Sequence, residues 1–302
     1  MTGKACRKIR RIIREIAGKI AREWEKRKKK PGRPRKYPLE AVVYAFLVRA
    51  IEGLTYRSVV MRRDVRVGTF QNLHAHLKRM PEDLLVEALR ELEREHHEVA
   101  SRVSEAVHGD GSVKRLLGRE KVKRKWRRKE REVWERKGIK MLVIARYVWD
   151  RRGRRHWAIV DVEVGEKREA DQKMVARMVE RCRMWGAKVF RGDANIVSGE
   201  GPGVLRRRGI RVEDRRQEEW NFEGIFGMIR TKIRPLYERI YTKKALYWLL
   251  LSINVRTLAI LRTRYFALLP VRISFVPIPS MPPYRVIPPM VDRTSVFAYI
   301  LH

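Results

Sequence analysis

The stretch Ala106-Val-His-Gly-Asp-Gly-Ser112 marks the point at which the sequence changes from helical to strand-like patterns. Val107 to Val113 is predicted as a β-strand, and Asp110 lies near its end between two glycines. Because glycine has no side chain, backbone or a ligand can approach this carboxylate closely. The chain therefore offers a rigidly held acid at a strand end.

The elements after this strand predict the fold class. Alternating and apolar patterns predict strands at 141–149, 157–164 and 188–190, and helices at 170–185 and 219–237. The order strand, strand, strand, helix, strand, helix is that of an RNase H-like α/β core. We assign this core to residues 101–262.

Two further acids lie in comparable settings. Asp193 follows the short strand in Lys188-Val-Phe-Arg-Gly-Asp-Ala-Asn195, and Glu223 begins a helix in Trp220-Asn-Phe-Glu-Gly-Ile-Phe226. Mg²⁺ and Mn²⁺ prefer oxygen ligands, and a pair of such ions can act on both oxygens of a phosphodiester. We therefore predict a two-metal site formed by Asp110, Asp193 and Glu223.

Two residues near Glu223 affect this hypothesis. Arg230 follows the glutamate by seven positions, so it shares a helix face with it and can hold a phosphate. Glu219 is a rival for the third carboxylate. No Gly-rich phosphate loop is present in the sequence, and we expect no ATP requirement.

The composition is strongly basic, with 71 Lys and Arg against 35 Asp and Glu and a formal charge of +36. Nucleic acid is the first partner that such a charge suggests and an anionic membrane the second, although a solvated basic surface also explains it. Two cysteines form no disulfide or zinc framework, which favours a reducing compartment. The apolar run 245–255 is too short and polar to cross a bilayer. We expect a cytoplasmic protein.

Residues 1–36 contain 16 Lys and Arg, and apolar residues recur at helical spacing from Ile9 to Trp24. This pattern predicts a basic amphipathic helix that either packs on the protein or contacts DNA or a membrane. The linker Lys30-Pro-Gly-Arg-Pro-Arg-Lys36 follows. Its Arg33, Arg35 and Lys36 can enter a DNA minor groove, or the segment is an ordinary linker.

Residues 37–100 predict an all-α, helix-turn-helix-like domain. The helices are expected at 38–53, 56–63, 69–79 and 82–99, with Thr55 and Thr69 as caps. The DNA-facing residues of the third helix would be Gln71, Asn72, His74, Lys78 and Arg79. A small helical bundle without a DNA role has the same pattern.

Residues 114–140 form a basic insertion between the first two strands, with 14 Lys and Arg and four Glu. It can clamp DNA through Lys125, Arg127 and Arg128, or it is a solvated helical hairpin. The tail 263–302 contains seven of the 13 prolines and is too apolar for a simple linker. We expect it to pack on the core or on a partner chain.

Several of these stretches together resemble the DDE transposases of prokaryotic insertion sequences. The matching pieces are Gly32-Arg-Pro-Arg-Lys-Tyr-Pro-Leu39, Gly53-Leu-Thr-Tyr-Arg57, His108-Gly-Asp-Gly-Ser112, Glu169-Ala-Asp-Gln172, Arg191-Gly-Asp-Ala-Asn195, Phe222-Glu-Gly-Ile-Phe-Gly-Met-Ile-Arg230 and Leu249-Leu-Leu-Ser-Ile-Asn254. They cover roughly residues 30–262. One family pattern has an arginine four positions before the glutamate, where this chain has Glu219. The subgroup is therefore not assigned.

The resemblance implies that Asp110, Asp193 and Glu223 are the metal-binding triad and that Arg230 is the basic residue after the glutamate. It implies metal-dependent cleavage and strand transfer at the ends of an element, on double-stranded DNA, by a homodimer or larger complex. A nuclease without strand transfer and a catalytically degenerate DNA-binding protein remain alternatives. Asp171 matches an acidic family position, but a helix N-cap explains it equally, and His108 is expected to be a packed histidine.

Overall fold

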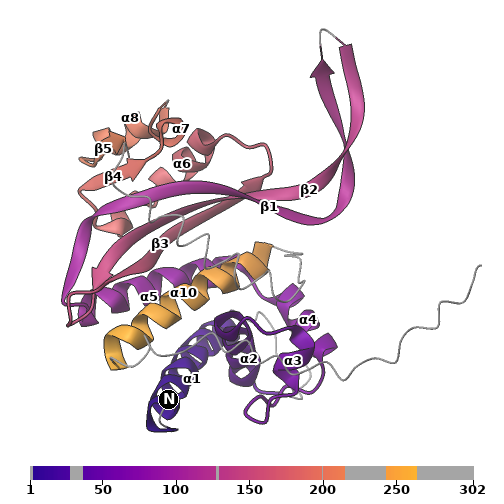
Figure 1. Cartoon of the computed structure of the whole chain (residues 1–302), viewed down its shortest axis with the longest axis vertical. Helices are drawn as coiled ribbons and strands as arrows, with labels where there is room; N and C mark the ends of the chain where they lie inside the picture. The colour runs from indigo at the N-terminus through magenta and orange to yellow at the C-terminus, as the bar shows by residue number, and fades with distance from the viewer. Residues whose placement is uncertain (1–2, 28–36, 127–128, 199, 215–242, 264–302) are drawn as a thin grey trace, which may run out of the picture. The chain divides into compact units, whose positions relative to one another are not determined.

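The structure is a computed structural model that describes residues 3–27, 37–126, 129–198, 200–214 and 243–263. These residues belong to one compact unit, which is a mixed α/β fold with a central five-stranded sheet (Figure 1). The helical region 37–100 and the sheet share a hydrophobic core. Two strands take part in it, together with α2 (Leu39–Glu52), α5 (Glu82–Val99) and α10 (Lys243–Thr263).

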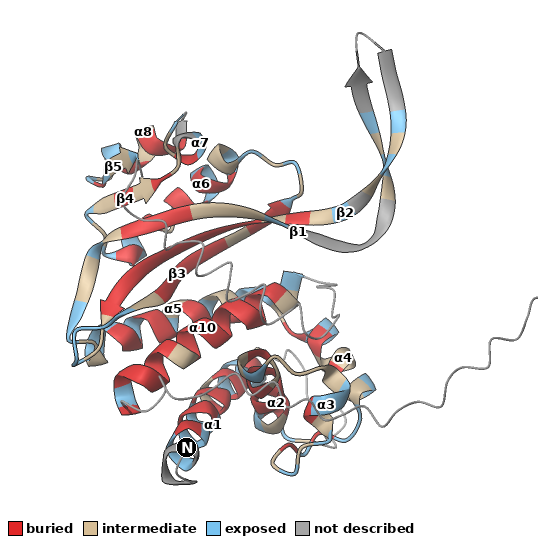
Figure 2. Cartoon of the chain, viewed as in Figure 1, coloured by how far each residue is buried: buried red, intermediate tan, exposed pale blue. Residues whose placement is uncertain are grey.

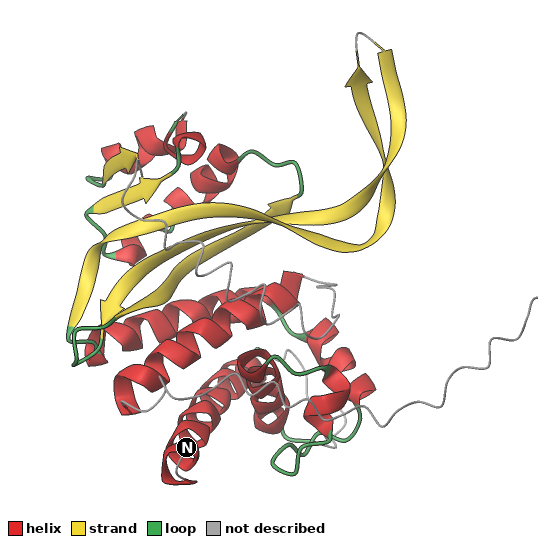
Figure 3. Ribbon diagram, in the orientation of Figure 1, coloured by secondary structure: helices red, strands yellow, loops and turns green. Residues whose placement is uncertain are grey.

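The sheet has the strand order β3-β2-β1-β4-β5. Its strands are β1 (Arg102–Trp126), β2 (Lys129–Trp149), β3 (Arg155–Glu166), β4 (Val189–Gly192) and β5 (Arg211–Asp214). β1 pairs antiparallel with β2, and β2 pairs antiparallel with β3. β4 pairs parallel with β1 on one side and with β5 on the other. Figure 3 shows the sheet between two groups of helices.

Alternate side chains of β2 belong to two separate hydrophobic cores, one on each face of the sheet. Met141, Val143 and Ala145 are buried on the face that is covered by α5 (Glu82–Val99) and α10 (Lys243–Thr263). Leu142 and Ile144 are buried on the opposite face, against α6 (Asp171–Val179). A strand buried on both faces reads as a continuous apolar run, which is why this segment was recognisable in the sequence.

Helix α10 also covers the edge of the sheet. β3 is the edge strand on this side, and an edge strand presents backbone groups that need partners. The Asn254 side chain accepts a hydrogen bond from the Ile159 N–H at 2.7 Å and donates to the Ile159 carbonyl at 2.9 Å. Thr257 donates to the Trp157 carbonyl at 2.7 Å. Side chains of α10 thus take the place of a neighbouring strand.

The other face of the sheet is covered by short elements. They are α6, the 3₁₀ turn η1 (Cys182–Trp185), α7 (Ala194–Val197) and α8 (Glu200–Arg207). Phe190 of β4 is fully buried here, stacks on Trp185 with ring centroids 6.2 Å apart, and lies under Gly109 of β1. A Cβ atom at Gly109 would come within 2.7 Å of the Phe190 ring, so glycine is required at this position.

The predicted helices of the N-terminal region are confirmed. They are α1 (Gly3–Lys26), α2 (Leu39–Glu52), α3 (Tyr56–Val60) and α4 (Phe70–Arg79). Thr55 and Thr69 accept hydrogen bonds from the Ser58 and Asn72 N–H groups, as expected of N-caps. The apolar face of α1 is buried against α2 and α10, so this helix packs on the protein.

Three features differ from the sequence predictions. The segment 114–140 is a β-ribbon, because β1 and β2 continue far beyond the sheet, and the helical hairpin is wrong. The helix predicted at 170–185 divides into α6 and η1, and α8 and β5 were not foreseen. Helix α10 is 21 residues long and apolar enough to cross a membrane by length, but 83% of its most apolar window is buried, which is consistent with a core helix of a soluble protein.

Candidate active site where β4 ends beside β1

Asp110 and Asp193 lie on neighbouring strands. The parallel ladder joins Ala106 with Val189, Val107 with Phe190 and His108 with Arg191. Continuing the same register by two residues brings Asp110 opposite Asp193, and adjacent strands are about 4.8 Å apart. By this extrapolation, Asp193, directly after the end of β4, lies beside Asp110 of β1. The predicted strand end at Asp110 is wrong, because β1 continues to Trp126.

Local hydrogen bonds fix both carboxylates. Asp110 Oδ1 accepts a hydrogen bond from the Gly111 N–H at 2.8 Å. Asp193 is the N-cap of α7, and its Oδ1 accepts from the Ile196 N–H at 3.0 Å. A Cβ atom at Gly192 would come within 3.0 Å of Ile196, which explains the glycine before this tight strand-to-helix turn.

The face on which Asp110 lies is settled by the register. Asp110 pairs with Val143 of β2, and residues opposite each other in a ladder share a face. Val143 belongs to the core under α5 and α10. Asp110 is thus on that face, at the edge of its apolar core.

Asp171 approaches the same strand from the opposite face, and its predicted role as an N-cap is wrong. Ala170 is the N-cap of α6, without a side-chain cap, and Asp171 is in the first turn. Its Oδ2 accepts a hydrogen bond from Lys140 Nζ at 2.9 Å. A Cβ atom at Gly111 would come within 2.4 Å of Asp171 Oδ1. Asp171 therefore buttresses β1 beside Asp110 from the α6 side, and Gly111 makes room for it.

His108 is a packed histidine, as predicted. It is 1% exposed, and its ring meets Tyr147 and Trp157 edge-on at centroid distances of 5.6 and 5.7 Å. His108 supports the floor of the site through aromatic packing.

Charged residues of β4 and β5 lie on the strands next to Asp193, and the sequence did not predict their pairing. Arg191 Nε donates to Glu213 Oε2 at 2.8 Å, and Arg211 pairs with the same glutamate. The hydrogen bond from Arg191 and the nearby positive charges hold the pKa of Glu213 below its ordinary value. Asp214, the last residue of β5, pairs in register with Gly192, the residue before Asp193. Only the register reveals this neighbour, because β5 has no apolar run.

The residues that were predicted to face DNA lie on α4. Gln71, Lys78 and Arg79 are exposed, whereas Asn72 is half-buried beside the Thr69 cap. His74 stacks on Tyr56 at 4.1 Å. Burial, followed by the charges of Arg49 and Lys78, lowers the pKa of His74, so its ring is held neutral. His74 is therefore a packing residue, and the exposed side chains of α4 are the ones available to a partner.

The remaining predicted residues lie outside the described part of the chain. This applies to the third acid, its neighbours and the basic linker: Glu219, Glu223, Arg230, Arg33, Arg35, Lys36, Arg127 and Arg128, together with the side chain of Lys125 and the tail after Thr263.

The oxygen donors of Asp110 and Asp193 fit the preference of Mg²⁺ or Mn²⁺ for carboxylates. Within the described residues, no three His, Cys, Asp or Glu side chains are grouped so as to hold a metal ion. A third ligand from the segment 215–242 is thus required by the predicted site. No protein-family model, curated protein or solved structure matches the chain.

Proposed function

We propose that this protein is a DDE-type transposase with an RNase H-like core, which cleaves DNA at the ends of an element and joins them to a target. The proposal combines the sequence resemblance with the arrangement of the sheet. Three antiparallel strands followed by a helix and two parallel strands, in the order β3-β2-β1-β4-β5, is the arrangement expected of such a core.

One observation carries the proposal. Asp110 and Asp193 are far apart in the sequence, and the parallel ladder, which joins Ala106–His108 with Val189–Arg191, has a register that pairs the two aspartates if it is continued by two residues. An acid within a long strand and an acid directly after the neighbouring strand, both held by backbone hydrogen bonds, suit metal-assisted attack on a phosphodiester.

The residues have the following proposed roles. Asp110 and Asp193 hold divalent ions, Glu223 adds the third carboxylate, and Arg230 binds a phosphate. Two such ions, when bound, activate the attacking oxygen and stabilise the leaving one. The backbone hydrogen bonds from Gly111 and Ile196 restrict the rotation of both carboxylates.

The expected partners follow from charge and reaction. Double-stranded DNA neutralises the net charge of +36, and joining two element ends requires a dimer or a larger complex. The protein would act in the cytoplasm, where bacterial or archaeal DNA lies.

The test is cleavage and strand transfer on DNA that carries the inverted repeats flanking the coding sequence, with Mg²⁺ or Mn²⁺. Wild type should cut and join, and Asp193→Asn should lose more than 100-fold of both activities while it still binds the DNA. Asp83→Asn is the matched control, because Asp83 is an exposed acid on α5 remote from β4. It should retain full activity.

Three outcomes would contradict the proposal. Equal activity of wild type and Asp193→Asn removes this acid from the chemistry. Cleavage without joining of pre-cut ends identifies a nuclease. Specific binding without any cleavage identifies a degenerate DNA-binding protein.

A further inference from the structure

The ends of β1 and β2 form a free-standing ribbon, here called the arm (residues 119–136). Its ladder runs through eight pairs, from Arg119–Arg136 to Trp126–Lys129, or about 25 Å. β3 pairs with β2 only as far as Ile139, and β4 pairs with β1 only at 106–108. Within the described residues, the arm therefore has no third strand, and it projects from the sheet (Figure 1).

The base of the arm is held in a defined position. A register shift between the pairs Arg115–Gly138 and Arg119–Arg136 leaves three residues of β1 opposite one of β2, and such a bulge bends and twists a ribbon. Glu135 is 13% exposed and accepts hydrogen bonds from Lys167 at 2.9 Å and Arg168 at 2.7 Å. The arm is thus anchored to the segment between β3 and α6.

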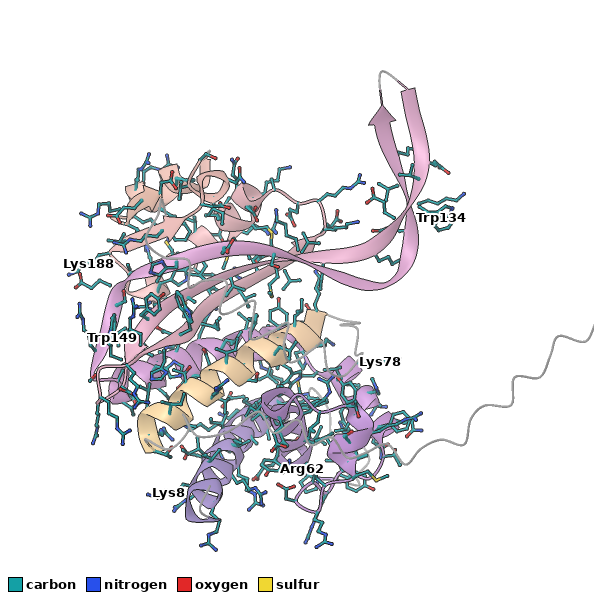
Figure 4. The ribbon with its side chains drawn as sticks, viewed as in Figure 1. Lys8, Arg62, Lys78, Trp134, Trp149 and Lys188 are labelled. Atoms are coloured by element: carbon teal, nitrogen blue, oxygen red, sulfur yellow. The ribbon has the colours of Figure 1, made fainter. Side chains whose placement is uncertain are left out.

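The arm combines positive charge with an exposed aromatic residue. Residues 119–136 include ten Lys and Arg against four Glu. Lys121 lies opposite Trp134, and Lys123 is two residues farther along the strand, so all three share one face. Trp134 is 60% exposed, and the Lys121 ammonium lies 5.6 Å from its ring centre (Figure 4). A core would bury such a tryptophan, whereas this one faces solvent among lysines.

These features match the DNA double helix in shape and charge. The major groove of B-DNA is about 12 Å wide and admits a two-stranded ribbon, while the deep groove of A-form RNA excludes side chains. The charge of the arm attracts phosphates, and an aromatic side chain can pack against the groove wall. We propose that the arm lies in a DNA groove, with Lys121, Lys123 and Trp134 as contacts, an inference that rests on the proposed action on DNA.

The arm also fits the position of the candidate site. It is the direct continuation of β1, and Arg119 is nine residues beyond Asp110, at most about 30 Å along the strand. This reach corresponds to roughly one turn of B-DNA. A single duplex can therefore contact the arm and still reach the edge where Asp110 and Asp193 lie.

The experiment compares DNA affinity across a range of salt concentrations for two double variants. Lys121→Gln with Lys123→Gln removes two arm charges. Lys26→Gln with Lys188→Gln is the matched control, since both lysines are more than 70% exposed and lie off the arm. Binding to a 40-base-pair duplex is measured by anisotropy in the Asp193→Asn background with EDTA. The slope of log K against log salt should fall by about 2 in the arm variant only.

A second readout uses the exposed tryptophan. DNA should reduce acrylamide quenching of wild-type fluorescence, and this protection should be absent in Trp134→Phe. Slopes that are equal in the arm and control variants, or a preference for duplex RNA of the same length, would overturn the proposal. If DNA binding depends on the arm but the protein never cuts DNA, the arm proposal stands and the transposase proposal is refuted. DNA cleavage by a protein whose binding does not depend on the arm would refute the arm proposal and leave the transposase proposal standing.

Discussion

The two halves of the β1–β2 pair have the same backbone pairing and opposite surroundings. In the sheet, the residues from Met141 to Ala145 are all fully buried. In the arm, the described side chains of the same strand are exposed or half-buried, as the colours of Figure 2 show. The continuous β1–β2 ladder is thus buried in the sheet and exposed to solvent in the arm.

The comparison shows that the backbone pairing of two strands and the burial of their side chains depend on different features of the sequence. Continuous Val, Ile and Leu residues draw helices onto both faces, whereas alternating Lys, Arg and Glu prevent this. An isolated two-stranded ribbon is only marginally stable. The sheet half should therefore carry the stability of the protein, and the arm should contribute little to it.

The largest expected difference comes from truncating one aromatic residue in each half. Phe190→Ala should lower the free energy of unfolding by about 3–5 kcal/mol, because the ring is fully buried against Trp185 and Gly109. Trp134→Ala should change it by less than about 0.5 kcal/mol. Urea unfolding measures both values. Comparable losses would show that the arm is packed in solution.

A second prediction concerns the loss of stability of the protein at mildly acidic pH. His96 on α5 is fully buried and donates from Nε2 to the Asn254 carbonyl, and burial lowers its pKa to about 4. The unfolded chain binds this proton near pH 6.5, so stability falls as pH decreases from 6.5 toward 4. The loss from this residue between pH 7 and pH 5 should be about 2 kcal/mol. The helix-covered half should therefore respond to mild acid.

The variant His96→Gln should flatten the pH dependence between pH 7 and pH 5, measured by urea unfolding at each pH. His97→Gln is the matched control, since His97 is adjacent, 40% exposed and paired with Glu93. An unchanged slope in His96→Gln would assign the acid response to other groups.

The smallest effect is expected at the junction of the two halves. Glu135→Gln weakens the ion pairs with Lys167 and Arg168 and should cost less than about 1 kcal/mol of global stability. Hydrogen exchange of the arm amides should nevertheless accelerate, while amides of 141–148 should not change. Glu132→Gln, at an exposed pair with Lys121, should leave both regions unchanged. Uniform acceleration would mean that the arm and the sheet open together.

The helices and the sheet strands were predictable because their signals are local. Thr55, Thr69 and Gly53 mark helix ends by capping chemistry, and the apolar run of β2 marks a buried strand. The arm was not recognised, since Lys, Arg and Glu favour helices and its strand pairing comes from continuity with the sheet. β5 was missed because its Arg-Val-Glu-Asp sequence gives no strand pattern.

The candidate site was predictable in part for similar reasons. A glycine beside an acid drew attention to Asp110 and Asp193, but the predicted strand end at Asp110 is wrong, because β1 continues to Trp126. Only the register of β1 and β4, continued by two residues, indicates that the two aspartates are neighbours. Asp171 was misassigned by one position, because an acid at the N-cap and one in the first turn look alike in sequence. Asp214 becomes visible only through its pairing with Gly192.

The hydrogen bonds of Asn254 also mean that the edge of β3 is completed late during translation of the chain. The partner of the Ile159 backbone is the side chain of Asn254, which is translated 95 residues later. Translation of these residues takes about 5–20 seconds at ordinary rates. Until then, the edge of the sheet is open to water or to the strand of another nascent chain. Fast translation through residues 160–254, or a chaperone that covers β3, should therefore raise the yield of correctly folded protein.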